Sequence, residues 1–257
     1  MSGRCILKLT GSDVKPFLQG LITNDIARLK NGLIYAALLT PQGKYVADFF
    51  LCEDEHQIYL DVGADLADTL IKRLTMYKLR SDVTITYSNL NIQRGTKATP
   101  SDAFHDPRHS DLGWRKYSTD PESDDGTDWD AIRVTNIIPE TGIELTENTF
   151  ILEARFEALF GVDFNKGCYV GQEVTARMKH KSKLRKGLTR VAIDKSVPVG
   201  TDILSNGKKA GTIYTQSHGF GIAHLYFDRS RQNMLAEDAK ITWKPENKET
   251  TQDGNPS

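Results

Sequence analysis

The sequence predicts an α+β protein whose C-terminal part is built from strands alone. Helical and strand-like hydrophobic spacings alternate through most of the chain before Gly161. From Leu188 to Trp243 only short strand-like runs remain, and Asn206-Gly207 between two of them is a strong hairpin signal. A chain of 257 residues can bury a sizeable core, either as one large domain or as two smaller ones.

Two helices are predicted in the N-terminal part. Residues 12–22 begin with Ser12, a favourable cap, and carry apolar side chains on one helical face. Residues 64–77 place three leucines and a tyrosine at helical spacing. Strand-like alternation predicts the other elements of this part. The predicted strands cover residues 34–39, 45–51, 57–62 and 83–87.

The middle of the chain is expected to be a long loop. Pro, Gly, Asp and Ser dominate between Thr96 and Asp130. Residues 150–160 then predict a helix, with Asn148 as its cap and Gly161 after its end. Residues 246–257 are polar with almost no apolar side chain, so we expect a disordered tail there.

Composition excludes several functional classes. Hydrophobic residues make up 39% of the chain and charged residues 26%, as in ordinary soluble globular proteins. A net charge of −1 argues against a nucleic-acid-binding protein. No apolar run approaches the ~20 residues that span a bilayer, and the N-terminus lacks the apolar segment of a signal peptide. We therefore expect a cytoplasmic monomer with no nucleic-acid partner and no membrane partner.

The cysteines indicate free thiols and no resident metal. Cys5, Cys52 and Cys168 form an odd and sparse set, which is typical of a reducing compartment. The sequence has no C-x-x-C pair, so we do not expect a zinc site or an iron–sulfur cluster held by cysteines of ordinary spacing. His105 and His109 are four residues apart, but a proline between them argues against one helix presenting both to a metal.

The most distinctive segment for chemistry runs from Lys166 to Glu173 and reads K-G-C-Y-V-G-Q-E. A thiolate is stabilised by a nearby positive charge or by a helix N-terminus. Cys168 could have both, through Lys166 and through a helix starting near Gly171. The alternative is a sharp turn into a helix with a structural cysteine, since free cysteine is commonly buried.

This octapeptide resembles the signature of the YgfZ-type folate-binding proteins, which are relatives of the T-protein (aminomethyltransferase) of the glycine cleavage system. Five further segments resemble blocks of that family in the same order, so the resemblance extends over most of the chain. These segments are Gly20–Ile26 (G-L-I-T-N-D-I), Leu39–Lys44 with Asp48-Phe49, Met76–Arg80 (M-Y-K-L-R), Asp106–Arg108 with Leu112-Gly113, and Gly211-Thr212 with Gly221–Ala223.

The resemblance implies both an architecture and a function. The architecture is a T-protein-like arrangement of mixed α/β subdomains around a central folate channel, with a C-terminal β-barrel. It divides the chain into a folate-binding region at 1–182, a barrel at 183–245 and the tail at 246–257. The implied function is a tetrahydrofolate-binding accessory factor for assembly or repair of iron–sulfur clusters in selected enzymes. Its partners would be folate and iron–sulfur client enzymes or assembly proteins.

Two other functions remain open. One is a folate-dependent aminomethyl or one-carbon transferase. The active block of T-protein carries two adjacent acids, whereas this chain has Ala47 before Asp48. That departure counts against transfer, because a carboxylate must position and stabilise a cationic folate nitrogen. Asp48 itself could be a polar residue at a strand edge. The other alternative is a non-catalytic folate-binding scaffold in which Cys168 is structural.

Side-chain chemistry suggests which residues would hold a folate. The ligand needs flat or apolar walls, a carboxylate or amide for its pterin edge, and cations for its glutamate tail. Taken singly, the wall candidates also fit a hydrophobic core and the cations also fit a solvated face. The candidates are Tyr35, Met76 and Trp114 for the walls, Lys78 and Arg80 for the tail, and Glu144 for the pterin edge.

The signature supplies the other candidates. Cys168 is expected to be the reactive or cluster-contacting thiol, and Lys166 is expected to tune it. Asp48 joins these two in the predicted catalytic set. Tyr169 and Arg177 join the predicted cofactor-binding set.

Overall fold

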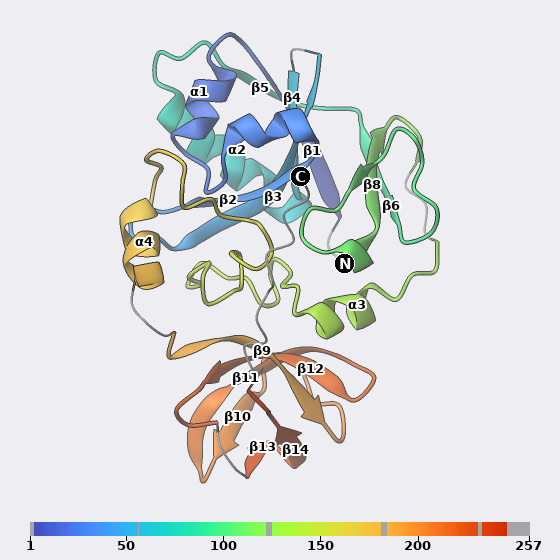
Figure 1. Ribbon diagram of the computed structural model, residues 1–257, viewed down its shortest axis with the longest axis vertical. Coiled ribbons are helices and arrows are strands. Elements are labelled where there is room, and N and C mark those ends of the chain that lie inside the picture. The colour runs from blue at the N-terminus through green and yellow to red at the C-terminus, as the bar shows by residue number, and fades with distance from the viewer. Residues whose placement is uncertain (1–2, 56, 122–124, 181–183, 231–232, 246–257) are drawn as a thin grey trace, which may run out of the picture.

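A computed structural model describes residues 3–55, 57–121, 125–180, 184–230 and 233–245, so the expected tail lies outside the described part. Two sheets with their helices form one body, and a six-stranded barrel lies at one end of the molecule (Figure 1). The predicted α+β class with a C-terminal β-barrel is confirmed. None of the described helices combines the length and the apolar character needed to cross a membrane.

The larger sheet is antiparallel, with five strands in the order β2-β3-β4-β1-β5. One face packs against three helices around Leu18, Phe49 and Leu70. The predicted N-terminal elements are therefore confirmed, with ends shifted by a few residues. The strands are β1 (Arg4–Thr10), β2 (Ile34–Leu39), β3 (Tyr45–Asp54), β4 (Gln57–Gly63) and β5 (Thr84–Tyr87), and the helices are α1 (Val14–Gln19), the 3-10 helix η1 (Ile26–Asn31) and α2 (Ala64–Lys78).

The opposite face of this sheet packs against the middle of the chain. Tyr35 and Phe50 from the sheet share one core with Leu112, Phe156 and Leu188. A three-stranded sheet in the order β6-β8-β7 lies beside the larger one (Figure 1). The elements of this part are β6 (Asn91–Gly95), β7 (Phe104–His105), η2 (Ser110–Leu112), β8 (Trp114–Ser118) and α3 (Trp129–Asn136).

The expectation of one long loop from Thr96 to Asp130 was wrong. β7 and β8 lie inside this segment, and β8 pairs with β7 and with β6, which precedes the segment. α3 begins at Trp129. The inward side chains of β8 are polar: Arg115 and Tyr117 both bond to the carboxylate of Asp61. A strand that buries ion-paired and hydroxyl groups shows no apolar alternation, so its composition resembled that of a loop.

The predicted helix over residues 150–160 was also wrong, because this segment forms successive turns. Arg155 and Phe160 have φ values of 65° and 54°, and a left-handed residue interrupts a right-handed helix. The segment is buried on several sides rather than on one stripe, since it lies between the larger sheet and the barrel. The Leu188 N–H of the barrel donates to the Glu153 carbonyl at 2.7 Å.

The C-terminal strands close into a barrel in the order β10-β11-β12-β9-β14-β13. Asn206 and Gly207, with φ values of 50° and 73°, form the predicted hairpin turn. An apolar cluster around Ile203, Ile213 and Leu225 fills the interior. The strands are β9 (Lys186–Ile193), β10 (Asp202–Ser205), β11 (Lys208–Ser217), β12 (Phe220–Tyr226), β13 (Met234–Ala236) and β14 (Ala239–Thr242).

The signature loop leads into α4 (Gln172–His180), as expected from its two glycines. Gly171 has a φ of 83°, and a Cβ there would lie 2.6 Å from the Thr40 carbonyl oxygen. Only glycine permits this approach. The signature is therefore held against the turn between β2 and β3.

Candidate functional site

A cavity of about 610 Å³ lies where the two sheets meet α3. Both sheets, α3 and the segments that flank α3 line it, so its walls come from regions far apart in the sequence. The lining residues are Gly3, Arg4, Asp48, Gly63, Ile92, Arg94, Arg108, Leu112, Arg115, Asp125, Thr127, Asp128, Trp129, Asp130, Arg133, Pro139, Glu140 and Thr141.

One side of the cavity is an arginine wall, formed by Arg4, Arg94, Arg108 and Arg115. Three of these guanidiniums lie near the ring of Phe50, with centroid distances of 3.8 Å for Arg115, 4.8 Å for Arg108 and 5.4 Å for Arg4. Arg94 lies 4.1 Å from the ring centroid of Trp129. Stacking on aromatic faces is favourable for guanidiniums and fixes their planes.

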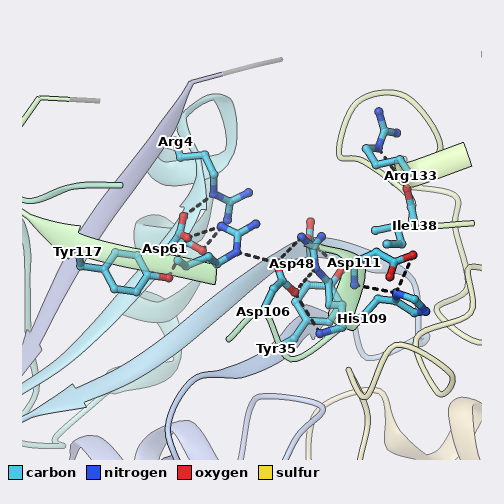
Figure 2. A network of polar contacts seen from close by, with 12 residues as sticks. Arg4, Tyr35, Asp48, Asp61, Asp106, His109, Asp111, Tyr117, Arg133 and Ile138 are labelled. Atoms are coloured by element: carbon cyan, nitrogen blue, oxygen red, sulfur yellow. Dashed lines mark hydrogen bonds and ion pairs between the residues drawn. The ribbon is translucent and has the colours of Figure 1, made fainter. Parts of the chain in front are cut away.

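Two buried carboxylates tie this wall together (Figure 2). Asp61 accepts from Arg4, from Arg115 Nη1 at 3.0 Å and from the Tyr117 hydroxyl at 3.0 Å. Asp106 accepts from Arg115 Nε at 2.8 Å and, through both oxygens, from Arg108 at 2.8 and 3.0 Å. The wall is thus a continuous lattice of charge-assisted hydrogen bonds.

Burial and charged neighbours shift the pKa values of two groups in the wall. Burial acts to raise the pKa of Asp106, but the ion pairs with Arg108 and Arg115 outweigh it and hold this pKa well below its usual range. Burial, together with the neighbouring charges of Arg115, Arg4 and Arg108, lowers the pKa of Arg94 to about 10.

Asp48 lies on β3, 5% exposed and surrounded by hydroxyl groups. Its Oδ2 accepts from Tyr35 at 3.0 Å, and its Oδ1 accepts from Tyr45 at 2.6 Å and from Thr141 at 2.5 Å. These donors fix the carboxylate in place at the cavity surface. Asp48 is therefore a buried site residue and not a polar residue at an exposed strand edge.

Ala47, the neighbour of Asp48, faces away from the cavity. It is fully buried in the core on the helix-covered face of the larger sheet. Successive strand residues point to opposite faces, so an acid at position 47 would enter that core. The side chain that the cavity receives from this pair of positions is the carboxylate of Asp48.

Acidic side chains of α3 and its flanking segments also line the cavity. Asp128 accepts from the Ala131 N–H at 2.9 Å and caps α3. Asp130 and Glu140 pair with Arg133 at 3.0 and 2.8 Å. The cavity therefore combines guanidiniums and carboxylates that are held by hydrogen bonds and ion pairs.

Of the predicted wall residues, Tyr35 reaches the site through its hydroxyl. Its ring is fully buried and packs on Phe50 and Phe156, with 5.1 Å between centroids in each case. Trp114 lies beside the cavity on β8, with its ring against Gly95, where a Cβ would come within 2.8 Å of it. The Trp114 Nε1 has no partner among the described residues.

The structure places three predicted folate-binding residues away from the cavity. Met76 is 68% exposed on the solvent face of α2, and Lys78 and Arg80 lie at the end of that helix. None of the three lines the cavity. The amphipathic pattern of α2 points its leucines inward, which leaves this motif on the outer surface.

Glu144 serves a connection rather than a cavity wall. Its side chain accepts from Arg133 at 2.6 Å and from the Thr215 hydroxyl of β11 at 2.6 Å. It also accepts from the Glu140 N–H at 2.9 Å. Glu144 therefore joins α3 to the barrel, and it does not line the cavity.

Lys166 is a buried structural cation. Its Nζ donates to the carbonyl oxygens of Gln19, Ile22 and Asn24 at 2.8, 2.6 and 3.0 Å. An ammonium group has three donors, so these bonds use its full capacity. Burial lowers the pKa of Lys166 to about 8. The side chain therefore fixes the segment of residues 19–24. The tuning of Cys168 by Lys166 stays a prediction.

The remaining signature residues divide between core and surface. Cys168 is exposed, whereas Tyr169 is 7% exposed in the core beneath the loop. Burial raises the pKa of Tyr169 to about 12. Arg177 is exposed on α4. None of these three lines the cavity, so the thiol and the cavity occupy separate places.

Sequence reasoning missed the arginine wall. Asp106 and Arg108 stood in a recognised block, but nothing in their spacing showed that they meet β1, β6 and β8. A weak signal was the presence of cations in segments of strand length, with Arg115 directly after Trp114 and Arg94 two residues after Ile92. Only the sheet pairing brings them to one side of a cavity.

No group of three or more potential metal ligands occurs among the described residues. The donor chemistry of the cavity is that of an organic ligand site, with fixed carboxylates, guanidiniums and aromatic faces.

Comparison with known proteins agrees with this architecture. Residues 185–248 match the family described as CAF17, C-terminal beta-barrel domain. The fold resembles that of glycine cleavage system aminomethyltransferase T from Bartonella henselae, with a TM-score of 0.71 over 93% of this chain and 82% of that chain. The two sequences are 13% identical, so this likeness concerns the fold alone.

The relatives found by sequence comparison and described here share the name IBA57. The chain is 29% identical to the iron-sulfur cluster assembly factor IBA57 homolog, mitochondrial, of Mycosarcoma maydis, over 71% of this chain and 54% of that protein. It is 27% identical to the mouse and to the human IBA57, over 88% and 89% of this chain and 76% and 77% of theirs. The chain thus spans about half the length of the fungal relative. By its barrel match, these relatives and its T-protein-like fold, the chain is similar to the IBA57/CAF17 (YgfZ-type) iron–sulfur cluster assembly factors.

Proposed function

We propose that this protein is a tetrahydrofolate-binding accessory factor for the assembly or repair of iron–sulfur clusters in selected enzymes. The observation that supports a folate as the ligand is the cavity lined by the fixed carboxylate of Asp48. The names of the relatives support the role in cluster assembly. Its partners are then folate and iron–sulfur client enzymes or assembly proteins.

A reduced folate suits this cavity in size and chemistry. Ligand sites commonly enclose about 300–1,000 Å³ and combine apolar walls with a few fixed polar groups. Ile92, Leu112 and Trp129 supply apolar surface. Asp48 offers acceptors to the N–H groups of a pterin edge, and this replaces the earlier assignment of that role to Glu144.

Calorimetric titration with tetrahydrofolate tests the ligand. We expect binding to the native protein, and about a tenfold loss of affinity in Asp48→Asn, because a charged acceptor is removed without a change in volume. Asp65→Asn is the control, since Asp65 is exposed in the first turn of α2. Absence of heat with the native protein, or equal affinities for native protein and Asp48→Asn, would contradict the proposal.

Complementation tests the cellular role. The chain should restore the activity of iron–sulfur enzymes in a strain that lacks its own relative of this family. Cys168→Ala should fail to do so if the thiol takes part, whereas full rescue by Cys168→Ala would favour the scaffold alternative.

Truncation at residue 182 tests the proposed division into 1–182 and 183–245. Fractionation tests the cytoplasmic location, since the relatives are named as mitochondrial.

Aminomethyl or one-carbon transfer is the second candidate. It is favoured by the carboxylate of Asp48, which faces the cavity even though Ala47 precedes it. Formation of methylene-tetrahydrofolate from tetrahydrofolate and an aminomethylated donor protein would support transfer. Tetrahydrofolate binding without any such product would leave the accessory role as the better description.

A further inference from the structure

We propose that the outer face of the C-terminal half of α2, with the turn that follows it, is a docking surface for an acidic segment of a partner protein. This surface, the α2 patch, consists of two exposed apolar side chains, Met76 and Leu79, and three exposed cations, Lys72, Arg73 and Arg80. None of the five residues lines the cavity, so the patch does not depend on the ligand that the cavity binds.

The first argument is the backbone of Leu79. The Ser81 N–H donates to the Lys78 carbonyl at 2.8 Å and closes a four-residue turn directly after α2. Leu79 is the second residue of this turn, with a φ of 47° and a ψ of −106°. These angles are those of a type II′ turn, which prefers glycine at this position because φ is positive. A leucine there is held in a strained conformation.

Burial does not compensate for this strain. Leu79 is 88% exposed, and Met76, three residues earlier, is 68% exposed. A strained residue with its side chain in water gains little packing energy from the fold, and such outliers point to a function. Contact with a partner would supply the burial that the fold does not.

The second argument is the arrangement of the side chains on α2. Residues three and four positions apart are neighbours on a helix, so Lys72 and Arg73 both lie next to Met76. This side of α2 faces away from Leu70 and Leu74, which are buried in the core. The cations and the apolar side chain therefore form one continuous outer surface.

An open hollow at the end of α2 continues this surface. Asp13, Leu79, Arg80 and Ser81 line it. The carboxylate of Asp13 already accepts from the Asp82 N–H at 2.8 Å. The hollow thus joins an apolar side chain to a guanidinium, and a partner segment with an apolar side chain next to a carboxylate matches both.

The third argument is charge. In the described part of the chain, the side chains of Lys72, Arg73 and Arg80 form no ion pair and no hydrogen bond. Asp68, one turn before Lys72, accepts from a tyrosine hydroxyl, and Asp82 accepts from a serine. The helix dipole favours cations only in the last turn, so it does not account for Lys72 and Arg73. The three cations are therefore available to the carboxylates of a partner.

Two other occupants fit the α2 patch less well. In a symmetric dimer the same face of two copies meets, which would place the cations of the patch against each other. A helix that binds a lipid surface turns a wide apolar face outward. The apolar face of α2 is instead buried in the core, and a flat lipid surface would not fill the hollow beside Leu79. An acidic protein segment satisfies the cations and the apolar side chains together.

Fluorescence anisotropy with a labelled helical peptide tests the α2 patch. The probe is built from glutamate and leucine, with leucine at every third or fourth position, and a second peptide has glutamine in place of glutamate. We expect native protein to bind the glutamate peptide and to bind the glutamine peptide at least about tenfold more weakly. Affinity for the glutamate peptide should fall as the salt concentration rises.

Leu79→Gly separates docking from folding. It should weaken the glutamate peptide about tenfold, because an apolar side chain is no longer buried on binding. It should not lower the melting temperature, because glycine adopts a positive φ without strain. Leu79→Met should keep the affinity, and Arg73→Gln should reduce it about two- to fivefold.

Val199→Ser and Lys30→Gln are the matched controls, since they remove an exposed apolar side chain and an exposed cation outside the patch. Both should bind the glutamate peptide as native protein does. Failure of native protein to bind this peptide, equal affinity for both peptides, or undiminished binding by Leu79→Gly would overturn the proposal. A lowered melting temperature in Leu79→Gly would also overturn it, because Leu79 would then serve the fold.

The other occupants have their own outcomes. Vesicles of phosphatidylserine and phosphatidylcholine probe a lipid surface, and sedimentation of the native protein probes a second copy. Vesicle binding or self-association that is lost in Leu79→Gly, without binding of the glutamate peptide, would overturn the acidic partner and assign the patch to that occupant.

Discussion

The three thiols differ in their exposure to solvent. Cys168 is exposed, Cys5 is partly buried in β1 and Cys52 is buried in β3. Burial raises the pKa of Cys52 to about 12 and also raises that of Cys5. The thiolate is the form that reacts with alkylating agents, so the raised pKa values of Cys52 and Cys5 slow their reaction.

We therefore expect iodoacetamide to label Cys168 first, Cys5 more slowly and Cys52 last in the folded protein. Mass spectrometry of partly alkylated native protein measures the order. Labelling in denaturant is the control, and there the three rates should converge. A Cys168 that is labelled after Cys5 would mean that the signature loop shields its thiol.

Lys166 has a structural role that the sequence did not suggest. Lys166→Ala removes a cation that bonds three buried or partly buried carbonyl oxygens. Unsatisfied buried acceptors cost about 1–3 kcal/mol each, so we expect the free energy of unfolding to fall by at least about 3 kcal/mol. Urea denaturation measures the change. Lys179→Ala, which breaks an exposed pair with Glu157, should cost less than about 1 kcal/mol.

At the scale of elements, apolar patterning was a sound guide wherever an element buries a single apolar face. It identified α2, the large sheet and the barrel strands, and the glycines placed the start of α4. It failed at β8, whose buried side chains Arg115 and Tyr117 are polar. It failed again at residues 150–160, which are apolar on several sides and contain two left-handed residues.

The sequence also predicted one part of the candidate site and missed another. Asp48 was identified because a sequence block carries it, and the structure brings it to the cavity. The arginine wall comes from β1, β6, β8 and the segment before η2, and no local pattern reports such pairing. Conversely, the cations at the end of α2 are adjacent in sequence to a recognised motif, and the helix turns them away from the cavity.

The lattice that joins β4 to β8 predicts a dependence of stability on pH. Asp106 has a lowered pKa in the folded state, so its ionised form contributes stability above its ordinary pKa of about 4, and this contribution is lost as the pH falls. Asp106→Asn should lower the free energy of unfolding by about 3–5 kcal/mol at neutral pH, because two buried arginines lose a partner.

Acid titration of stability separates this effect from simple loss of packing. Denaturation between about pH 6 and pH 3 should show a smaller decline for Asp106→Asn than for the native protein, since the variant no longer has that group to protonate. Asp65→Asn, at an exposed position in the first turn of α2, is the control. Parallel declines for native protein and Asp106→Asn would show that the lattice does not set the acid stability.

At the scale of the whole molecule, polar contacts connect the cavity with the separate signature loop. The Tyr35 hydroxyl bonds Asp48 at the cavity, and the Tyr35 carbonyl accepts from Asn24 Nδ2 at 2.8 Å. Asn24 Nδ2 also donates to the Phe160 carbonyl at 2.7 Å, and the Asn24 carbonyl accepts from Lys166 at 3.0 Å. Cys168 follows Lys166 by two residues. A contiguous network of this kind can carry coupling, although coupling has to be measured.

We expect saturating tetrahydrofolate to slow the alkylation of Cys168 about fivefold, the lower end of ordinary coupling between sites. A ligand bound at Asp48 should restrain Tyr35, and through Asn24 and Lys166 the loop that carries the thiol. Asn24→Ala should bind tetrahydrofolate with unchanged affinity and lose most of the slowing. Alkylation of Cys5 provides the internal control in the same samples. If Cys168 reacts at one rate with and without bound folate, the thiol and the cavity act independently, and the polar path between them only supports the fold.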